Sequence, residues 1–408
     1  MPRQSSAHDL WTSEPVARAR DALRARDAEI VASQIAVSEI EAPTGGERRR
    51  GTWVAERFRE IGLRDVRMDA ADNVIGRREG AADAAPVVIC AHLDTVFPPG
   101  TPVGVRRSGA RLLGPGIGDN GRGLAAMLAL AGVIDGTHVR THAPVDFVAT
   151  VGEEGAGDLR GAKHFFDHAG DARAAIALDG AGDERIVHCA LGSRRFRISF
   201  RGPGGHSWTA FGVPNAVHAA ALAAAKLARL PRPASPRTTI SVGRIGGGIA
   251  VNAIPDEGWL EVDLRSTSAA VLDRYEREIH AAARAASDEE NGRRAHGTPP
   301  LSESIARIGA RPGGDTDAAH PLVAFAVDAT RVIGREPELA TASTDANVPI
   351  SRGIPAIAIG AGGRGGDAHT PAEWFDNTDG PTGLARALAI VIGAAGLASG
   401  ACAAPPIV

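Results

Sequence analysis

The amino-acid sequence predicts an α/β protein with a mainly parallel sheet and an inserted α+β domain. Its short apolar runs are almost continuous, which is typical of parallel strands that are buried on both faces. Helix-like segments and glycine-rich turns separate these runs, and one long segment departs from the pattern. The chain has 408 residues, which is too many for one ordinary hydrophobic core and favours two domains.

The larger predicted domain comprises residues 1–192 and 304–408. A helical pattern covers residues 14–41. Beyond it, strands are predicted at Val87–Ala91, Val145–Val151, Ala174–Leu178 and Ile354–Ile359, and helices at Gly123–Ile134 and Leu159–His168. Because strands and helices alternate along the chain, we expect a layered α/β domain.

Residues 193–303 predict a smaller domain with a different pattern. Between Arg195 and Phe200, apolar and polar residues alternate with period two, as in a strand that has one face in water. The further elements are predicted to be the helices Asn215–Leu230 and Ser268–Ala286 and the strands Thr238–Val242 and Trp259–Leu264. A polar stretch with glycine and proline at residues 287–320 is predicted to be the linker that returns the chain to the first domain.

The composition limits the class of partner. With 45 basic and 48 acidic residues the net charge is −3, so we expect neither nucleic acid nor a membrane as a partner. The uncharged stretch 387–408 is rich in Ala and Gly and contains two prolines, which favours a packed C-terminal helix with a loose tail over a membrane anchor. Three widely spaced cysteines without a CxxC pair suit a reducing compartment, and we expect a cytoplasmic protein.

Residues that can bind metal ions follow the predicted strands. In open α/β sheets, ligands bind beyond the carboxyl ends of the strands, so we expect side chains from several strands to meet at one edge. In chain order they are His92 and Asp94, then Glu153 and Glu154, then Asp179, and finally His369 after a glycine-rich loop.

Two of these pairs have an evident geometry. His92 and Asp94 are two residues apart and point the same way on a strand, so His92 can bind a metal ion while Asp94 supports it. The alternative is a strand-end histidine and a helix-capping aspartate. The neighbouring Glu153 and Glu154 diverge on extended backbone, so one can face a metal ion and the other a bound water. Buried without a cation they would repel each other, but an exposed acidic turn before a helix is the alternative.

Asp119 lies in the glycine-rich segment Gly114–Gly123, just before an apolar helix. So many glycines indicate unusual backbone angles or a close approach. Asp119 could instead cap the helix, whereas a phosphate-binding loop is disfavoured because the GxxxxGK[ST] pattern is absent. Three carboxylates, two divalent cations and a bridging hydroxide would form a neutral cluster. Mixed imidazole and carboxylate ligands favour two zinc ions, with cobalt or manganese as possible substitutes.

Five short segments stand in order along the chain: His92-Leu93-Asp94-Thr95, Gly118-Asp119-Asn120-Gly121, Gly152-Glu153-Glu154-Gly155, Gly204-Gly205-His206-Ser207 and His369-Thr370-Pro371. In this order they resemble the signatures of the co-catalytic zinc exopeptidase family. That family includes aminoacylase, acetylornithine deacetylase, succinyl-diaminopimelate desuccinylase, glutamate carboxypeptidase and the bacterial tripeptidase. The resemblance covers roughly residues 50–380, and five ordered motifs are far more specific than one.

The resemblance implies the metal ligands and the zinc-exopeptidase fold, with a catalytic domain and an inserted lid and dimerisation domain. Asp119 would bridge two metal ions. His92 and Asp179 would complete one site, and Glu154 and His369 the other.

The resemblance also implies the remaining roles. Glu153 would be the general base, and Asp94 would orient His92. In a homodimer formed through the lid domain, His206 would reach the partner's active site and stabilise the oxyanion. Asn252 and Arg265 would bind the substrate, with Arg265 gripping a carboxylate; a turn asparagine and a surface arginine are the alternatives.

The predicted function is the metal-dependent hydrolysis of an amide bond in a small peptide or an N-acyl amino acid. A di- or tripeptidase-like exopeptidase is preferred, and an N-acyl- or N-carbamoyl-amino-acid amidohydrolase is the alternative. A non-catalytic metal-stabilised binding protein is disfavoured by the intact Glu153, and a serine esterase by the absence of a GxSxG elbow. The segment Ser343–Asn347 resembles a family loop that closes the substrate pocket, but it could equally start a capped helix.

Overall fold

The computed structural model describes residues 6–168, 171–398 and 406–408. It has two compact units, one made of the described residues up to Ala190 and from Asp315 onward, and one made of Leu191–Gly314. The second unit ends at Gly314 rather than at residue 303. The predicted linker at 287–320 is wrong over much of its length, because Ser302–Arg311 forms a strand of the second unit's sheet.

The centre of the first unit is a parallel group of four strands in the order β6-β3-β7-β17. These are the four strands that the sequence predicts, so the predicted α/β class with a mainly parallel sheet is confirmed. Their bounds are β3 Val87–His92, β6 Val145–Thr150, β7 Ala174–Leu178 and β17 Ala356–Ile359.

Antiparallel strands extend this sheet at both edges. On one side β2 pairs with β6 and β1 with β2, and on the other side β8 pairs with β17. A further strand, β16, runs parallel to β8, and β15 ends the sheet. The bounds are β1 Arg64–Met68, β2 Val74–Arg78, β8 Arg185–Ala190, β15 Gly314–Asp315 and β16 Glu338–Ala342.

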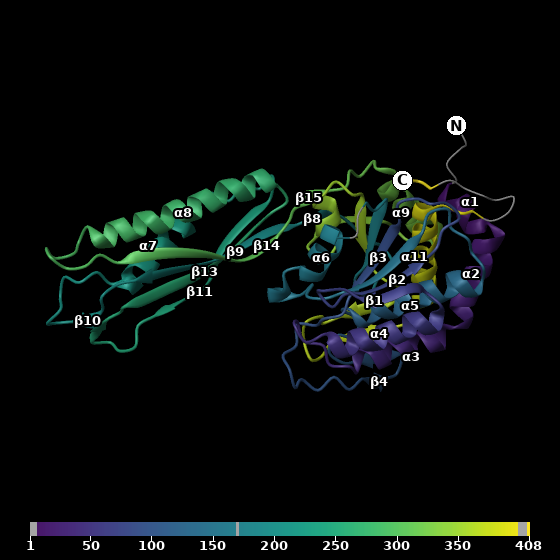
Figure 1. The fold of residues 1–408 in the computed structure, drawn as a ribbon, viewed down its shortest axis with the longest axis horizontal. Coiled ribbons are helices and arrows are strands. Elements are labelled where there is room, and N and C mark those ends of the chain that lie inside the picture. Colours follow the sequence, from purple (N-terminus) through teal and green to yellow (C-terminus); the bar gives the residue numbers. More distant parts are fainter. Residues whose placement is uncertain (1–5, 169–170, 399–405) are drawn as a thin grey trace. The chain divides into compact units, whose positions relative to one another are not determined.

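Helices cover both faces of the sheet (Figure 1). Along β3 the side chains alternate, so that Val87, Ile89 and Ala91 join the core on one face. Val88 and Cys90 join the core on the other. The helices of the first core are α1 Ala7–Thr12, α2 Glu14–Ala25, α3 Asp27–Ser38, α4 Arg48–Ile61, α5 Gly121–Gly136, α9 Pro321–Val332 and α11 Gly380–Ala395; those of the second are α6 Arg160–His168 and α10 Asn347–Ser351.

The two ends of the chain pack as helices. The predicted helical region 14–41 is two helices, α2 and α3, which meet at Arg26. Helix α11 is buried along most of its length, as predicted for the C-terminal segment, and most of the predicted loose tail lies outside the described residues. Among those that are described, no helix is long and apolar enough to cross a membrane.

The first unit also contains a small antiparallel sheet with strand order β18-β19-β5-β4. Strand β5 leads into the loop that carries Asp119, and β18 and β19 flank the loop that carries His369. The pairing of β5 with β19 therefore joins these two loops. The bounds are β4 Arg106–Ser108, β5 Arg111–Leu113, β18 Arg364–Gly366 and β19 Trp374–Asp376.

The second unit is an antiparallel sheet of order β11-β13-β9-β14 with helices α7 and α8 on one face (Figure 1). On β9, Phe196, Ile198 and Phe200 point into this core, whereas Arg195 and Arg197 on the other face form ion pairs with β13. The two-stranded ribbon β10-β12 projects separately. The bounds are β9 Gly192–Arg201, β10 Gly205–His206, α7 Ala216–Ala228, β11 Thr238–Gly247, β12 Ala253–Ile254, β13 Glu257–Ser266, α8 Ala269–Asn291 and β14 Ser302–Arg311.

Candidate metal centre

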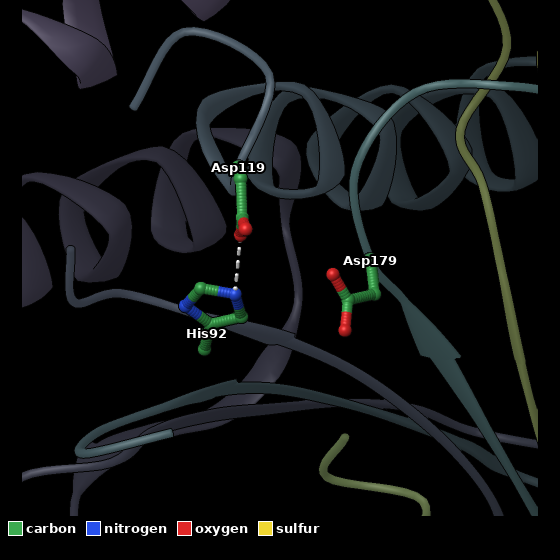
Figure 2. Close-up of side chains that lie close together, drawn as sticks. All are labelled: His92, Asp119 and Asp179. Carbon is green, nitrogen blue, oxygen red and sulfur yellow. Dashed lines mark hydrogen bonds and ion pairs between the residues drawn. The ribbon is translucent and has the colours of Figure 1, made fainter. Parts of the chain in front are cut away.

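Metal-binding side chains converge at the carboxyl ends of the parallel strands. His92 ends β3, Glu154 follows β6 just before the short 3-10 helix Gly155–Gly157, and Asp179 follows β7. Ligand atoms of His92, Asp119 and Asp179 lie within 4.8 Å of one another, and so do those of Asp119, Glu154 and His369. Figure 2 shows His92 pointing at Asp119, with the Asp179 carboxylate turned toward the same space. The two groups share Asp119.

The two carboxylate oxygens of Asp119 face different histidines. His92 Nε2 lies 3.0 Å from Oδ1, and His369 Nε2 lies 3.1 Å from Oδ2. His369 Nε2 also lies 2.9 Å from Glu154 Oε1. A carboxylate that presents one oxygen to each of two imidazoles has the geometry needed to bridge two cations, since zinc binds nitrogen and oxygen at roughly 2.0–2.2 Å.

The electrostatics of the centre fit a pair of cations. Burial and the neighbouring charge of Asp119 raise the pKa of Asp179 to about 7, and burial also raises the pKa of Glu154. Although burial opposes its charge, hydrogen bonds to Asp119 and Asp94 raise the pKa of His92 well above the usual value. The hydrogen bond to Asp119 raises the pKa of His369 to about 9. Protons thus neutralise the clustered acids, and divalent cations held by the same donors would replace them.

Asp94 organises both the histidine and the two glutamates. The Nδ1 atom of His92 lies 3.0 Å from the backbone oxygen of Asp94, which leaves Nε2 directed at Asp119. The fully buried Asp94 carboxylate also accepts the backbone N–H groups of Glu153 and Glu154, each at 2.9 Å. Although its burial opposes the charge, the contacts with His92 and these two N–H groups lower the pKa of Asp94 to about 2. Asp94 therefore fixes the turn after β6 as well as the ring of His92.

Glu153 and Glu154 are both buried, and the divergence of their side chains stays a prediction. Glu154 contacts His369, while Glu153 has a carboxylate oxygen within 4.8 Å of ligand atoms of His92 and Glu154. Glu153 thus lies beside the centre without contributing to the two groups that contain Asp119.

Asn120 has a positioning role that the sequence analysis missed. Its Oδ1 accepts the N–H groups of Gly123 and Gly180, both at 3.1 Å, and its Nδ2 donates to Leu178 at 2.9 Å. Asn120, rather than Asp119, is therefore the cap of α5. Its position directly before the helix is the sequence signal that could have identified it. The residue ties the Asp119 loop to the end of β7.

Glu373 is the second missed residue. Its carboxylate is buried and accepts three backbone N–H groups of the loop that carries Asp119. No local pattern marks it, because its partners are more than 250 positions away in the sequence.

The other predicted site residues, His206, Asn252 and Arg265, lie in the second unit. His206 lies exposed on β10, next to Asn252, whose backbone oxygen accepts the N–H of Ser207. Arg265 donates from Nε to Asp263 on the same strand at 2.7 Å. All three belong to the second unit, and their roles stay predictions.

The segment Ser343–Asn347 is an ordered turn that leads into α10. The N–H of Thr344 donates to the side chain of Asn347 at 3.0 Å, and the hydroxyl of Thr150 at the end of β6 donates to Asp345 at 2.5 Å. This turn therefore contacts the strand that precedes Glu153.

A cavity of about 590 Å³ opens beside the centre within the first unit. Asp119 and Asp179 line it, together with Arg364 and Trp374 of the small sheet. It offers space for a substrate next to the clustered ligands.

Curated relatives match parts of the chain. A protein of Aspergillus terreus named a probable carboxypeptidase is 28% identical over 255 residues, which are 56% of this chain and 58% of that protein. An N-carbamoyl-L-amino acid amidohydrolase of Geobacillus stearothermophilus is 37% identical over 114 residues, 28% of this chain and 24% of that enzyme. The chain thus matches less than two thirds of the length of either relative.

Solved structures share the fold over most of the chain. The aminopeptidase PepT of Bacillus cereus and a tripeptidase of Staphylococcus aureus are each 22% identical, with TM-scores of 0.72 and 0.73. Both alignments cover 89% of this chain, and 97% and 96% of the other chains. A Bacillus subtilis protein described as a dinuclear metal-binding peptidase is 15% identical, with a TM-score of 0.66 over 90% of this chain and 98% of its own.

The family comparison matches residues 88–392 to peptidase family M20/M25/M40. This range is more than half of the chain, and it contains the whole cluster from His92 to His369. The chain therefore belongs to peptidase family M20/M25/M40.

Proposed function

We propose that this protein is a two-metal hydrolase that cleaves an amide bond near one end of a small peptide. The position of Asp119 carries the proposal, because its two oxygens face His92 at the end of β3 and His369 in the loop before β19. The fold shared with an aminopeptidase and a tripeptidase supports an exopeptidase, and the similarity to a dinuclear metal-binding peptidase supports two ions. We propose zinc, with cobalt or manganese as substitutes, because the donors mix imidazole and carboxylate.

The chain's own residues would share the work of catalysis. Bound divalent cations would lower the pKa of a water and polarise the scissile carbonyl. Glu153, buried beside the ligands, would take the proton of the attacking water and pass it to the leaving amine. His206 would stabilise the oxyanion, and Asn252 and Arg265 would hold the substrate.

A homodimer through the second unit is part of the proposal. Four apolar side chains, Trp208, Phe211, Ile249 and Val251, are each at least 85% exposed. They lie on the loops that follow β10 and precede β12; His206 ends β10, and Asn252 comes directly before β12. An exposed apolar patch of this kind is typical of an interaction surface, and a second copy of the chain would cover it.

We also propose a cytoplasmic location, since Cys90 and Cys189 are unpaired.

An N-acyl- or N-carbamoyl-amino-acid amidohydrolase is the second candidate. The similarity to the N-carbamoyl-L-amino acid amidohydrolase supports it, and the chemistry at the metal centre would be the same.

The two candidates are separated by metal analysis combined with a substrate screen. The zinc-loaded protein is incubated with dipeptides, tripeptides, N-acetyl amino acids and N-carbamoyl amino acids, and the released amino groups are quantified. Faster hydrolysis of the peptides would support the exopeptidase, and faster hydrolysis of the acylated or carbamoylated amino acids the amidohydrolase. A protein that holds two metal ions and hydrolyses none of these classes would contradict both.

A further inference from the structure

The Glu373 carboxylate lies directly against the loop that carries Asp119. The residue is 1% exposed. Oε1 accepts the N–H groups of Gly118 and Asp119, both at 2.8 Å, and Oε2 accepts the N–H of Gly116 at 2.9 Å. Both oxygens are thus used, and one of the three donors is the backbone of Asp119 itself.

The loop is shaped to admit this carboxylate. A Cβ atom at position 118 would lie 3.1 Å from Oε1 of Glu373, which is closer than most carbon atoms approach. Glycine at 118 therefore permits the short hydrogen bonds. The backbone oxygen of Glu373 also accepts the N–H of Gly114 at 2.9 Å, so side chain and backbone hold the same loop.

Glu373 is at the same time part of the turn that presents His369. Its N–H donates to the oxygen of Thr370 at 3.1 Å, directly after His369. Strand β19 then begins at Trp374, which pairs with Leu113 of β5. A shift of Glu373 would therefore move His369 and Asp119 relative to each other.

We propose that Glu373 is a positioning residue for both metal ions of the centre. Its carboxylate acts through the backbone N–H groups of Asp119 and of the neighbouring Gly116 and Gly118. It would keep Asp119 and His369 in place to hold a cation, and it would place its carboxylate behind that of Asp119. This inference rests on the proposed two-metal function.

The substitution Glu373→Gln tests the role with little change of volume. It removes the charge and leaves one acceptor oxygen, so at least one of the three N–H groups faces an amide nitrogen. We expect the affinity for both ions to fall by about 10- to 100-fold, measured by competition with a chromophoric chelator. The visible spectrum of the cobalt-substituted protein should change as well, because the ligand geometry shifts.

Glu290→Gln is the matched control. Glu290 is also buried, and its Oε1 accepts the backbone N–H of Asn215 at 2.9 Å in the second unit. This variant should keep the metal affinity and the cobalt spectrum of the parent protein, even if its melting temperature falls. A loss of affinity common to both variants would show a general effect of destabilisation and would overturn the inference.

Gly118→Ala probes the same contact from the other side. The added methyl group presses on Oε1 without altering a charge, and we expect it to weaken metal binding in the same direction. It also provides the test if Glu373→Gln does not fold. Unchanged affinities in the folded variants would overturn the role of Glu373. A parent protein that binds fewer than two ions per chain would overturn the proposed centre itself, and this inference with it.

Discussion

Glu153 and Glu154 are adjacent acids for which we propose different roles. Both are buried after β6, and the backbone of both is held by Asp94. Glu154 Oε1 lies 2.9 Å from His369 Nε2. We propose that the Glu154 carboxylate is a metal ligand and that the Glu153 carboxylate is the proton acceptor.

Replacing Glu153 by alanine is expected to remove the base and to leave the ligands in place. The turnover number should fall by about 10²–10⁴-fold, while metal analysis still finds two ions per chain. Full activity in this variant would show that another group takes the proton. Loss of metal together with activity would mean that Glu153 is a ligand.

Removal of the metal ions is expected to destabilise the protein more at alkaline than at acidic pH. The pKa of Asp179 is raised from 3.8 to about 7. The folded protein therefore loses stability as the pH rises from 3.8 to 7 and this carboxyl group gives up its proton. The pKa of His369 is raised from 6.5 to about 9. The stability that its charge supplies is therefore complete below 6.5 and lost as the pH rises through 9.

Bound cations would restore the stability that is lost at Asp179 and His369, because they take the place of the protons. The rise in melting temperature on adding zinc to the metal-free protein should therefore be larger near pH 8.5 than near pH 5.5, by differential scanning fluorimetry. An equal rise at the two pH values would contradict the assignment of Asp179 and His369 to the centre.

At the scale of elements, the start of α5 connects the metal centre to the core. Asn120 caps the helix and also binds the end of β7. The cap therefore has two functions, helix stability and the spacing of Asp119 from Asp179.

Asn120→Ala should consequently lower the free energy of unfolding by roughly 1–2 kcal/mol and weaken metal binding. Asn215→Ala is the comparison, since Asn215 caps α7 of the second unit with hydrogen bonds to Val217 and His218. It should lower stability alone. Urea unfolding and chelator competition measure the two quantities. Equal metal affinities in both variants would limit Asn120 to an ordinary cap.

The elements that the sequence predicts are those with a continuous local signal. Strands β3, β6, β7 and β17 are buried along their whole length. His92 ends β3, and Glu154 and Asp179 come within a few residues after β6 and β7. The segment of strand β14 resembles a linker in sequence because it includes Ser, Glu, Arg and Gly. It forms an edge strand of its sheet and pairs with β9. Glu373 could not be found in this way, because its role depends on a contact with a distant loop.

At the scale of the whole molecule, the exposed patch of Trp208, Phe211, Ile249 and Val251 makes the oligomeric state testable. Trp208→Asp places a charge in the proposed interface and is expected to shift the protein from dimer to monomer in analytical ultracentrifugation. Metal content should not change, because the ligands belong to the first unit. A parent protein that is already monomeric would contradict the dimer.

If His206 acts on the partner's centre, two inactive variants should complement each other. A mixture of His206→Ala and Glu153→Ala subunits, exchanged and reassembled, is expected to regain activity, since one of the mixed centres has both groups intact. Each variant alone provides the baseline. No recovery in mixtures shown to exchange subunits would place His206 outside the partner's site.

The second unit is inserted into the first one, so the ribosome makes the first unit in two separate parts. His92, Asp119 and Asp179 all precede Leu191, whereas His369 follows Gly314. Strand β17, which fills the place between β7 and β8, also emerges only after the insertion is complete. A nascent chain can therefore bring His92, Asp119 and Asp179 together early. His369 and strand β17 can join them only when the last quarter of the polypeptide leaves the ribosome.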